Sequence, residues 1–428
     1  MIPIVIKKLL DKHKSKLYPL VAVSDQALLS LINLLSNVFI IRFATKPEFG
    51  IYGVGFASIL LISGVTHALI SLQMTLIAPD KLESQRNIYF GSMFIAMVIL
   101  IGVFVMLALL GVSVSEGVIS DDYRLLIGVV VLSVPGVLMM QFMRQYYYFF
   151  NLAHRVLMFD LVFFFSYFCV LTLLVYFEAN NIHLWALFVN GSIALILGLI
   201  AILSSIRASI GASFGLARRS FIEAWRSGSW AVLGSLMTVL QTQGYIYLLL
   251  FLKGASSVAE MNAARLFLSP LLVMSAGFSR VMIPKMALLK SKGNIAHAIR
   301  LAIKVMIMLI AMLFLYLGVI MFAWEWLSIY MEGKGYENMG RLVAMWGLFF
   351  VGSVMGNAPS ELLQVFRQFR LLTLAGMITS VLVLLASIPA IVYLDTIGAV
   401  LILIIGEIGL AVLLWVHFRR MRKNMLEI

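Results

Sequence analysis

The sequence predicts an all-helical, polytopic membrane protein, and two observations lead to this fold class. The first is composition, because 62% of the 428 residues are hydrophobic, 12% are charged and the mean hydropathy is +1.04. A soluble domain of this length would be far more polar. The second is that its long apolar runs lack the two-residue alternation of a membrane β-strand, and only helices or closed barrels satisfy their backbone in lipid.

Twelve apolar runs are each long enough to be a transmembrane helix, since about 20 residues cross the hydrocarbon layer. They cover residues 18–41, 51–77, 88–112, 123–148, 156–177, 184–206, 228–252, 262–284, 301–324, 341–363, 371–394 and 397–418. We therefore expect about twelve transmembrane helices.

Lys and Arg residues are divided unevenly between the alternate loops that these spans create. Twenty-five of the 32 fall on the side that carries both termini, and seven fall on the other. By the positive-inside rule, both termini face the cytoplasm. The same asymmetry explains the net charge of +13 as a topological signal, so nucleic acid is not an expected partner.

The chain also divides into two halves that contain similar short sequences at matching positions. We expect a basic cytoplasmic segment (residues 1–17), a six-span N-lobe (18–206) and a cytoplasmic linker (207–227). A six-span C-lobe (228–418) and a cytoplasmic tail (419–428) follow. Span four has Pro135 followed by QFMRQ, and span ten has Pro359 followed by QVFRQ. Matching spans run in the same direction, which predicts a parallel repeat with a pseudo-twofold axis around a central cationic cavity.

Polar side chains inside the spans are expected to face that cavity. Two stripes recur at steps of three and four residues, which places each on one helical face. The span-one stripe is Gln26, Ser30, Asn33 and Asn37, and the span-seven stripe is Ser235, Thr238, Thr242 and Tyr245. Hydrogen bonding between packed helices is the alternative explanation for any single member.

Arginines at membrane depth are more informative, because a buried guanidinium is costly unless it is hydrated or paired. Arg265 and Arg280 of span eight are fifteen residues apart, which places them near one face of the helix and roughly 22 Å apart along its axis. Arg144 lies near the inner end of span four, and Arg42 ends span one but is rotated away from its stripe. A cationic cavity selects an anionic passenger, although snorkelling to headgroups would also explain Arg144 and Arg280.

Titratable groups within the spans are candidates for coupling transport to an ion gradient. Glu407 lies near the middle of span twelve, where a carboxylate must be protonated, paired or hydrated. In an ideal helix, His67 shares a face with Ser63 and Ser71. Asp25 and Glu361 are further candidates, and a structural hydrogen bond is the alternative role for Glu407.

The loops and motifs do not indicate an enzyme. The longest predicted external loop, residues 325–340, leaves little room for acid–base groups outside the membrane. The single cysteine, Cys169, and the scattered histidines lack the spacing of metal ligands. We therefore expect no metal and no cofactor.

Three segments resemble a known family. They are SDQALLSLINLLSNVFIIRFATKPEFGIYGV (Ser24 to Val54), RQYYYFFNLAHRVLMFD (Arg144 to Asp160) and NAARLFLSPLL (Asn262 to Leu272). They are similar to polysaccharide-type, O-antigen (Wzx-like) flippases of the multidrug/oligosaccharidyl-lipid/polysaccharide exporter superfamily. The resemblance extends over most of the chain.

The resemblance implies that the passenger is an undecaprenyl-pyrophosphate-linked oligosaccharide, moved from the cytoplasmic to the periplasmic leaflet of the bacterial inner membrane by alternating access. The implied pyrophosphate or acidic-sugar contacts are Arg42, Arg265 and Arg280. The implied cavity-lining residues are Asp25, Gln26, Asn33 and Asn37. Its implied partners, besides membrane lipids, are the polymerase and chain-length proteins of the same pathway.

Three alternatives remain open. A multidrug or cation exporter of the same superfamily has the same architecture, but several cavity arginines would repel its passengers. A lipid II flippase carries the same polyprenyl pyrophosphate, although relatives of that type usually have two more spans. A polymerase or assembly scaffold is disfavoured by the short loops.

Overall fold

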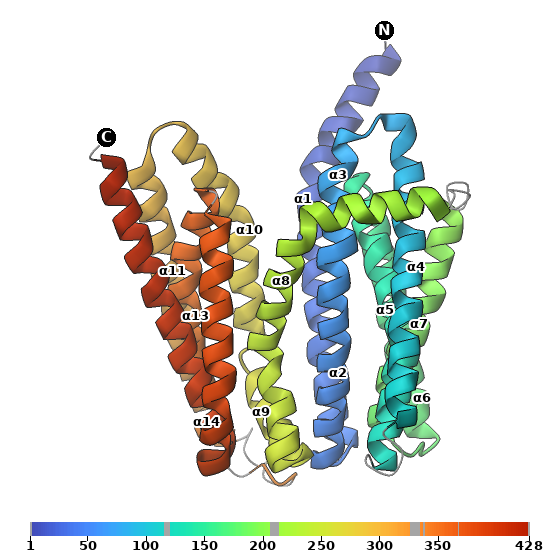
Figure 1. The fold of residues 1–428 in the computed structure, drawn as a ribbon, viewed down its shortest axis with the longest axis vertical. Helices are drawn as coiled ribbons and strands as arrows, with labels where there is room; N and C mark the ends of the chain where they lie inside the picture. Colours follow the sequence, from blue (N-terminus) through green and yellow to red (C-terminus); the bar gives the residue numbers. More distant parts are fainter. Residues whose placement is uncertain are drawn as a thin grey trace. The chain divides into compact units, whose positions relative to one another are not determined.

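The computed structural model describes residues 2–114, 120–205, 214–325, 334–336, 339–366 and 368–426, in part through the backbone alone. Within these ranges all the secondary structure is helical (Figure 1). Among the described helices, ten are long and apolar enough to cross a membrane, and a bent pair, α9 (Ala255–Leu266) with α10 (Ser269–Ser291), gives an eleventh span. The predicted polytopic helical fold is confirmed.

A twelfth span is contained in α14 (Phe369–Leu426), whose 58 residues are far too many for one crossing. Asp395 interrupts this helix with φ 56° and ψ −137°. Gly398 then lies directly against the carbonyl of Ala390, whereas a straight helix would separate these residues by about 12 Å. The chain therefore reverses direction here, and α14 contains both predicted spans, 371–394 and 397–418 (Figure 1).

The chain divides into two compact units. Unit 1 consists of Met1–Ala44 and Gly55–Leu236, and unit 2 consists of Thr45–Val54 and Met237–Ile428. The segment predicted as a linker is helical from Phe214 onward, because α8 (Phe214–Lys253) continues from it into the seventh span. Residues 206–213 lie outside the described ranges.

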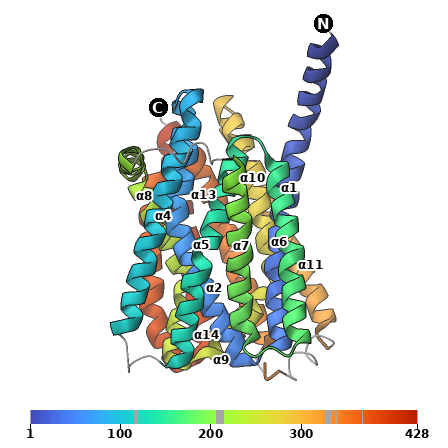
Figure 2. The same ribbon diagram turned by 90° about the vertical axis from the view of Figure 1, so that its right-hand side faces the viewer.

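Unit 1 is built around three helices that run side by side, α5, α6 and α7 (Figure 2). Glycine allows α5 and α7 to approach closely, since a Cβ on Gly136 would overlap the carbonyl of Gly191. This unit contains parts of two helices, α8 and α2 (Lys46–Thr66), whose first residues to Val54 belong to unit 2. Its other helices are α1 (Ile2–Phe43), the π-helix η1 (His67–Ser71), α3 (Leu72–Ile77), the 3-10 helix η2 (Ala78–Asp80), α4 (Glu83–Val114), α5 (Asp121–Phe149), α6 (Ala153–Tyr176) and α7 (Ile182–Ser205).

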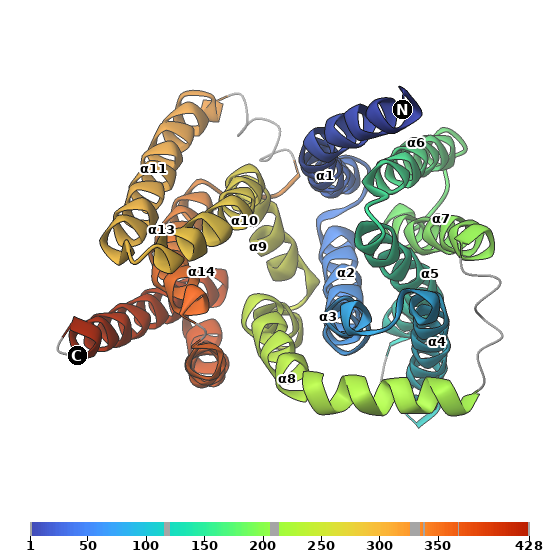
Figure 3. The ribbon, with the colours of Figure 1, turned by 90° about the horizontal axis from the view of Figure 1, so that it is seen from above.

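Unit 2 is centred on α13 (Met339–Val365), which packs against α9, α10, α14 and α11 (Ile295–Phe322) (Figure 3). Gly352 of α13 lies against Glu407 and Ile408 in the second half of α14, and the Trp415 indole N–H donates to the carbonyl of Met355 at 3.0 Å. This pair of helices corresponds in position to α5 and α7. Each unit therefore packs its fourth span against its sixth, and each fourth span contains an internal proline.

Candidate functional site

Arg144, on α5, lies between two carboxylates of unit 1. Its Nη2 is 2.6 Å from Oδ2 of Asp25 on α1, and its Nη1 forms an ion pair with Oδ2 of Asp160 on α6. The hydroxyl of Tyr148, one turn further along α5, donates a hydrogen bond to the same Asp25 oxygen. Three helices of unit 1 are thus joined by one guanidinium.

This charged cluster is buried. The side chains of Asp25 and Asp160 are 1% and 2% exposed, and that of Arg144 is 13% exposed. One guanidinium balances one ionised carboxylate, so the cluster is neutral when Asp25 and Asp160 share one proton. Asp25 and Arg144 are thus buried and paired with each other, and their predicted role in lining the cavity stays a prediction.

The sequence reasoning missed Asp160 as a partner of Arg144, although the signal was present. Arg144 lies five residues before the end of α5 at Phe149, and Asp160 lies seven residues after the start of α6 at Ala153. In an antiparallel pair joined by a short turn, these two positions reach a similar depth. The hairpin spacing therefore points to the ion pair.

Arg265, in the last turn of α9, has a different environment in unit 2. Its Nη1 is 3.4 Å from the hydroxyl of Tyr245 on α8, and its guanidinium carbon is 5.7 Å from the ring centroid of Trp346 on α13. Among the described residues, Arg265 forms no ion pair with a carboxylate. Its charge is held by aromatic groups and is not neutralised by them.

A break in the helix directly follows Arg265. Pro270 lies in the first turn of α10 and lacks the N–H that would continue the helix, and α9 and α10 meet at an angle of 59°. The hydroxyl of Tyr316 on α11 donates to the carbonyl of Phe267 at 2.7 Å, which satisfies a backbone acceptor at the break.

The break overturns one geometric prediction. Arg265 and Arg280 were expected on one face of a continuous helix, but they belong to α9 and α10. The side chain of Arg280 lies outside the described part of the chain, so its contact with a passenger stays a prediction.

The polar stripe of span one is half-buried to exposed on α1. The Ser30 hydroxyl donates to the carbonyl of Gln26 at 2.9 Å, and the Asn37 amide donates to the carbonyl of Asn33 at 2.7 Å. These two bonds stay within α1, and Asn33 is exposed. A cavity-lining role for Gln26, Asn33 and Asn37 stays a prediction.

The remaining predicted positions are more scattered. Arg42 is exposed, and its guanidinium carbon is 5.7 Å from the ring centroid of Phe43. In the span-seven stripe, Thr242 bonds to the carbonyl of Val239 within α8. The side chains of Ser235 and Thr238 lie outside the described residues.

Glu407 takes part in a polar network that joins both halves of α14 to α8. Its Oε1 accepts a hydrogen bond from Nε2 of Gln241 at 3.1 Å, and Oε1 of Gln241 accepts one from the hydroxyl of Ser380 at 3.1 Å. The hydrogen bond that was the structural alternative for Glu407 is therefore present. Its coupling role stays a prediction.

His67 does not share a face with the two serines. Ser63 and Ser71 are buried, at 5% and 3% exposure, whereas His67 is exposed. A π-helix over residues 67–71, in which the N–H of Leu72 bonds to the carbonyl of His67 five residues earlier, separates His67 from Ser71. The wider turn changes the rotation between residues four apart, so a prediction that assumes ideal α-helical geometry does not apply here.

No protein-family model and no curated protein sequence matches the chain. Solved structures are similar to it. The inward-facing conformation of a multidrug resistance MATE family transporter of the MOP superfamily aligns with a TM-score of 0.68 and 14% identity, over 95% of this chain and 98% of that one. The outward-facing conformation of such a transporter gives 0.61 and 14%, over 97% and 96%.

A MOP superfamily transporter from Pyrococcus furiosus aligns with a TM-score of 0.63 and 15% identity, over 97% of this chain and 96% of that one. The binding pocket of that protein is described as having reverse polarity, suggesting a different function. Such identities demonstrate similarity of fold and nothing more. The described helices and these alignments together give the chain the fold of the MATE family transporters of the MOP superfamily.

Proposed function

We propose that this protein is a flippase that moves an undecaprenyl-pyrophosphate-linked oligosaccharide, such as an O-antigen repeat unit, from the cytoplasmic to the periplasmic leaflet of the bacterial inner membrane by alternating access. One observation carries the proposal. Arg265 is a guanidinium inside a broken span, and it has no carboxylate partner among the described residues.

The chemistry of that arginine fits a pyrophosphate. A guanidinium at membrane depth is tolerated when it meets water or an anion. Trp346 contacts one face of the group and Tyr245 contacts one nitrogen, and the geometry of the guanidinium suits bidentate bonding to two phosphate oxygens. In unit 1, the exposed amide of Asn33 is suited to hydrogen bonding with sugar hydroxyls.

The structural neighbours support the mechanistic part of the proposal. Transporters of this fold have been solved in inward-facing and outward-facing conformations, which is what alternating access requires. The reverse polarity described for the Pyrococcus furiosus pocket supports the idea that this fold accommodates passengers of different charge.

The test is translocation by the purified, reconstituted protein. A fluorescent polyprenyl-pyrophosphate disaccharide is placed in the liposome, and its transfer is followed with a membrane-impermeant quencher. Arg265→Ala is expected to slow transfer about 10- to 100-fold, because charge-assisted hydrogen bonds to the passenger are lost. Arg265→Lys should retain part of the rate, since it keeps the charge without the planar fork.

The matched control is Arg300→Ala, which removes an exposed arginine of the same unit on α11. It is expected to leave the rate unchanged. The proposal would be overturned if the Arg265→Ala variant, present at the normal protein level, translocated the glycolipid normally and gave cells a normal amount of surface polysaccharide.

A multidrug or cation exporter is the second candidate, and two carboxyl groups favour it. Glu361 and Glu407 lie in spans of unit 2, and neither forms an ion pair with a cation among the described residues. The double variant Glu361→Gln/Glu407→Gln separates the two functions. Export of a cationic dye by the wild type that is lost in this variant, with no glycolipid transfer by the wild type, would favour the exporter.

A further inference from the structure

The first half of α8, residues 214–226, lies across α4 in unit 1 as an amphipathic helix (Figures 1 and 3). Its inward face carries small buried residues, Ala217, Ser220 and Ala224. Large apolar side chains stay exposed beside them, with Ile222 at 39% and Trp225 at 49%. A basic helix with this pattern is typical of one that lies in the membrane interface.

A cavity of about 260 Å³ lies between this segment and α4. Its walls include Ile99 and Val103 of α4 and Phe221 of α8, and the one charged residue that lines it is Arg218. Ile99 and Val103 are 43% and 44% exposed on a helix of mean hydropathy 3.1, so the cavity borders the lipid-facing surface of α4.

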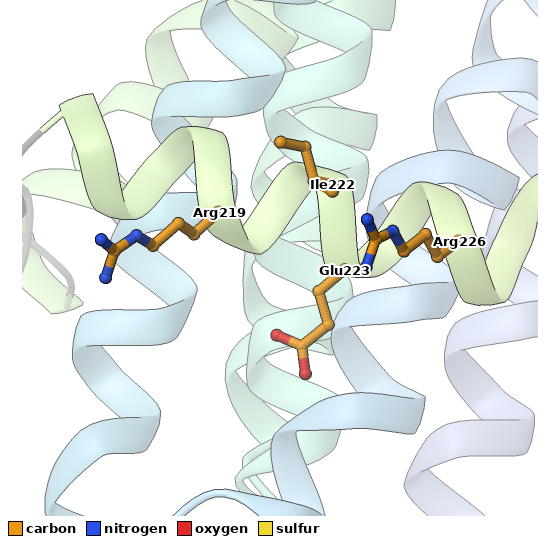
Figure 4. Close-up of a pocket in the computed structure, with 4 residues that line it drawn as sticks. All are labelled: Arg219, Ile222, Glu223 and Arg226. Carbon is orange, nitrogen blue, oxygen red and sulfur yellow. The ribbon is translucent and has the colours of Figure 1, made fainter.

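Three arginines lie within this segment, and its single acidic residue is already paired. Both carboxylate oxygens of Glu223 accept from Nζ of Lys81, at 2.8 and 3.0 Å. Figure 4 shows Arg219 and Arg226 on either side of Ile222 and Glu223, around a second, open hollow of about 480 Å³. In the described structure, Arg218, Arg219 and Arg226 form no ion pair.

We propose that this site binds one anionic phospholipid. Arg218 holds the headgroup phosphate at the mouth of the apolar cavity, Arg219 and Arg226 add attraction for the negative charge, and part of one acyl chain fills the cavity. Basic pockets beside transmembrane helices are suited to such headgroups. The cavity is smaller than most pockets for whole ligands, which agrees with its taking only a segment of a chain.

Two features select the phospholipid over other anions and other lipids. A soluble phosphate would leave the apolar walls between α4 and α8 uncovered, and a zwitterionic lipid would not satisfy the surplus of positive charge. The site is carried by α4 and α8 alone. The proposed phospholipid site therefore does not depend on whether the passenger is a glycolipid.

The experiment measures lipid binding to the full-length protein in detergent by native mass spectrometry and titration. The probes are dioleoyl phosphatidylglycerol, dioleoyl phosphatidylcholine and glycerol phosphate. The wild type is expected to bind phosphatidylglycerol at least tenfold more tightly than either other probe. Replacing all three arginines, as Arg218→Ala/Arg219→Ala/Arg226→Ala, should weaken that binding on the order of 100-fold, given the usual contribution of each basic residue near an anionic surface.

The matched control replaces three exposed basic residues of unit 2, as Lys292→Ala/Arg300→Ala/Lys304→Ala, and should bind as the wild type does. Val103→Trp fills the cavity and should weaken phosphatidylglycerol binding about tenfold with the arginines intact. Val103→Phe is the smaller variant to use if the tryptophan lowers the unfolding temperature.

Three outcomes would overturn the proposal. They are equal binding of phosphatidylcholine and phosphatidylglycerol, unchanged binding by the triple arginine variant, and unchanged binding by a folded cavity-filling variant. Glycerol phosphate binding as tightly as phosphatidylglycerol would also overturn it, because the occupant would then be a free phosphate.

Discussion

Arg144 and Arg265 are both arginines within apolar spans, but their surroundings differ in charge. Arg144 is held between Asp25 and Asp160, whereas Arg265 meets Tyr245 and Trp346. The first guanidinium holds α1, α5 and α6 together, whereas the second has no carboxylate partner among the described residues. An arginine within a span is therefore a candidate anion site only when no carboxylate lies within ion-pairing distance of its guanidinium.

The corresponding helices of the two units show the same contrast. In unit 1 the first and fifth spans are joined through the charges of Asp25 and Asp160. In unit 2 the seventh and eleventh spans are joined by the neutral pair Gln241 and Ser380, at 3.1 Å. A similar helix arrangement is thus stabilised by ions in one unit and by neutral hydrogen bonds in the other.

The largest expected effect on stability is at Arg144. Arg144→Met leaves two buried carboxylates without their cation and should lower the free energy of unfolding by about 3–5 kcal/mol. Denaturant unfolding in detergent measures the change. Arg155→Met is the control, since Arg155 is exposed and lies over the Tyr147 ring without an ion pair among the described residues, and it should cost less than about 1 kcal/mol. Equal costs for the two variants would contradict the structural role of Arg144.

The next largest loss of stability is expected to differ between two adjacent tyrosines of α5. Tyr148→Phe removes a hydrogen bond to the carboxylate of Asp25 and should cost about 1.5–3 kcal/mol, as bonds to charged groups do. Tyr147→Phe removes a neutral bond to Ser205 at 3.0 Å and should cost about 0.5–1.5 kcal/mol. The same unfolding assay compares them. A larger cost for Tyr147→Phe would show that Asp25 is not charged in the folded protein.

Replacing Arg265 should cost less stability than replacing Arg144. Arg265→Met removes a cation–π contact and a long hydrogen bond, so we expect a loss of about 1 kcal/mol or less. Translocation by the same preparation should nevertheless fall sharply. A loss of stability as large as that of Arg144→Met would mean that Arg265 is a structural residue with an unrecognised partner.

The smallest change in stability is expected at Glu407. Glu407→Gln keeps an oxygen that accepts from Gln241, so its effect should stay within about 0.5 kcal/mol. If Glu407 carries the coupled proton, this variant loses the dependence of transport on a pH gradient. Reconstituted vesicles under an imposed gradient measure that dependence, and an unchanged dependence would remove Glu407 from coupling.

Much of the fold was predictable because each span depends on the hydropathy of its own residues. Hydropathy over about 20 residues locates a span without knowledge of its neighbours. It separated spans 371–394 and 397–418, although their helices run together as α14 in the structure. It did not anticipate that span eight breaks after Arg265, since Pro270 kinks or ends a helix only where neighbours such as Tyr316 satisfy the freed backbone groups.

The candidate site was predictable only as a set of residue types. Sequence reasoning selected Arg144, Arg265 and His67 because ionisable groups are rare inside spans. It assigned both arginines to the cavity and named no carboxylate partner for Arg144, because a hydropathy profile contains no information about which helices touch. It also oriented His67 by ideal α-helical rotation, which the π-helix η1 changes.

Composition, periodicity and the placement of basic residues were sufficient to predict a multispan helical protein that has Arg265 at membrane depth. They could not reveal that Asp25 binds Arg144 or that Arg265 faces Trp346 and Tyr245, because those contacts form between distant helices that pack only after the chain folds. The energy of a buried charge depends on the groups within a few ångströms of it, and those groups come from distant parts of the sequence.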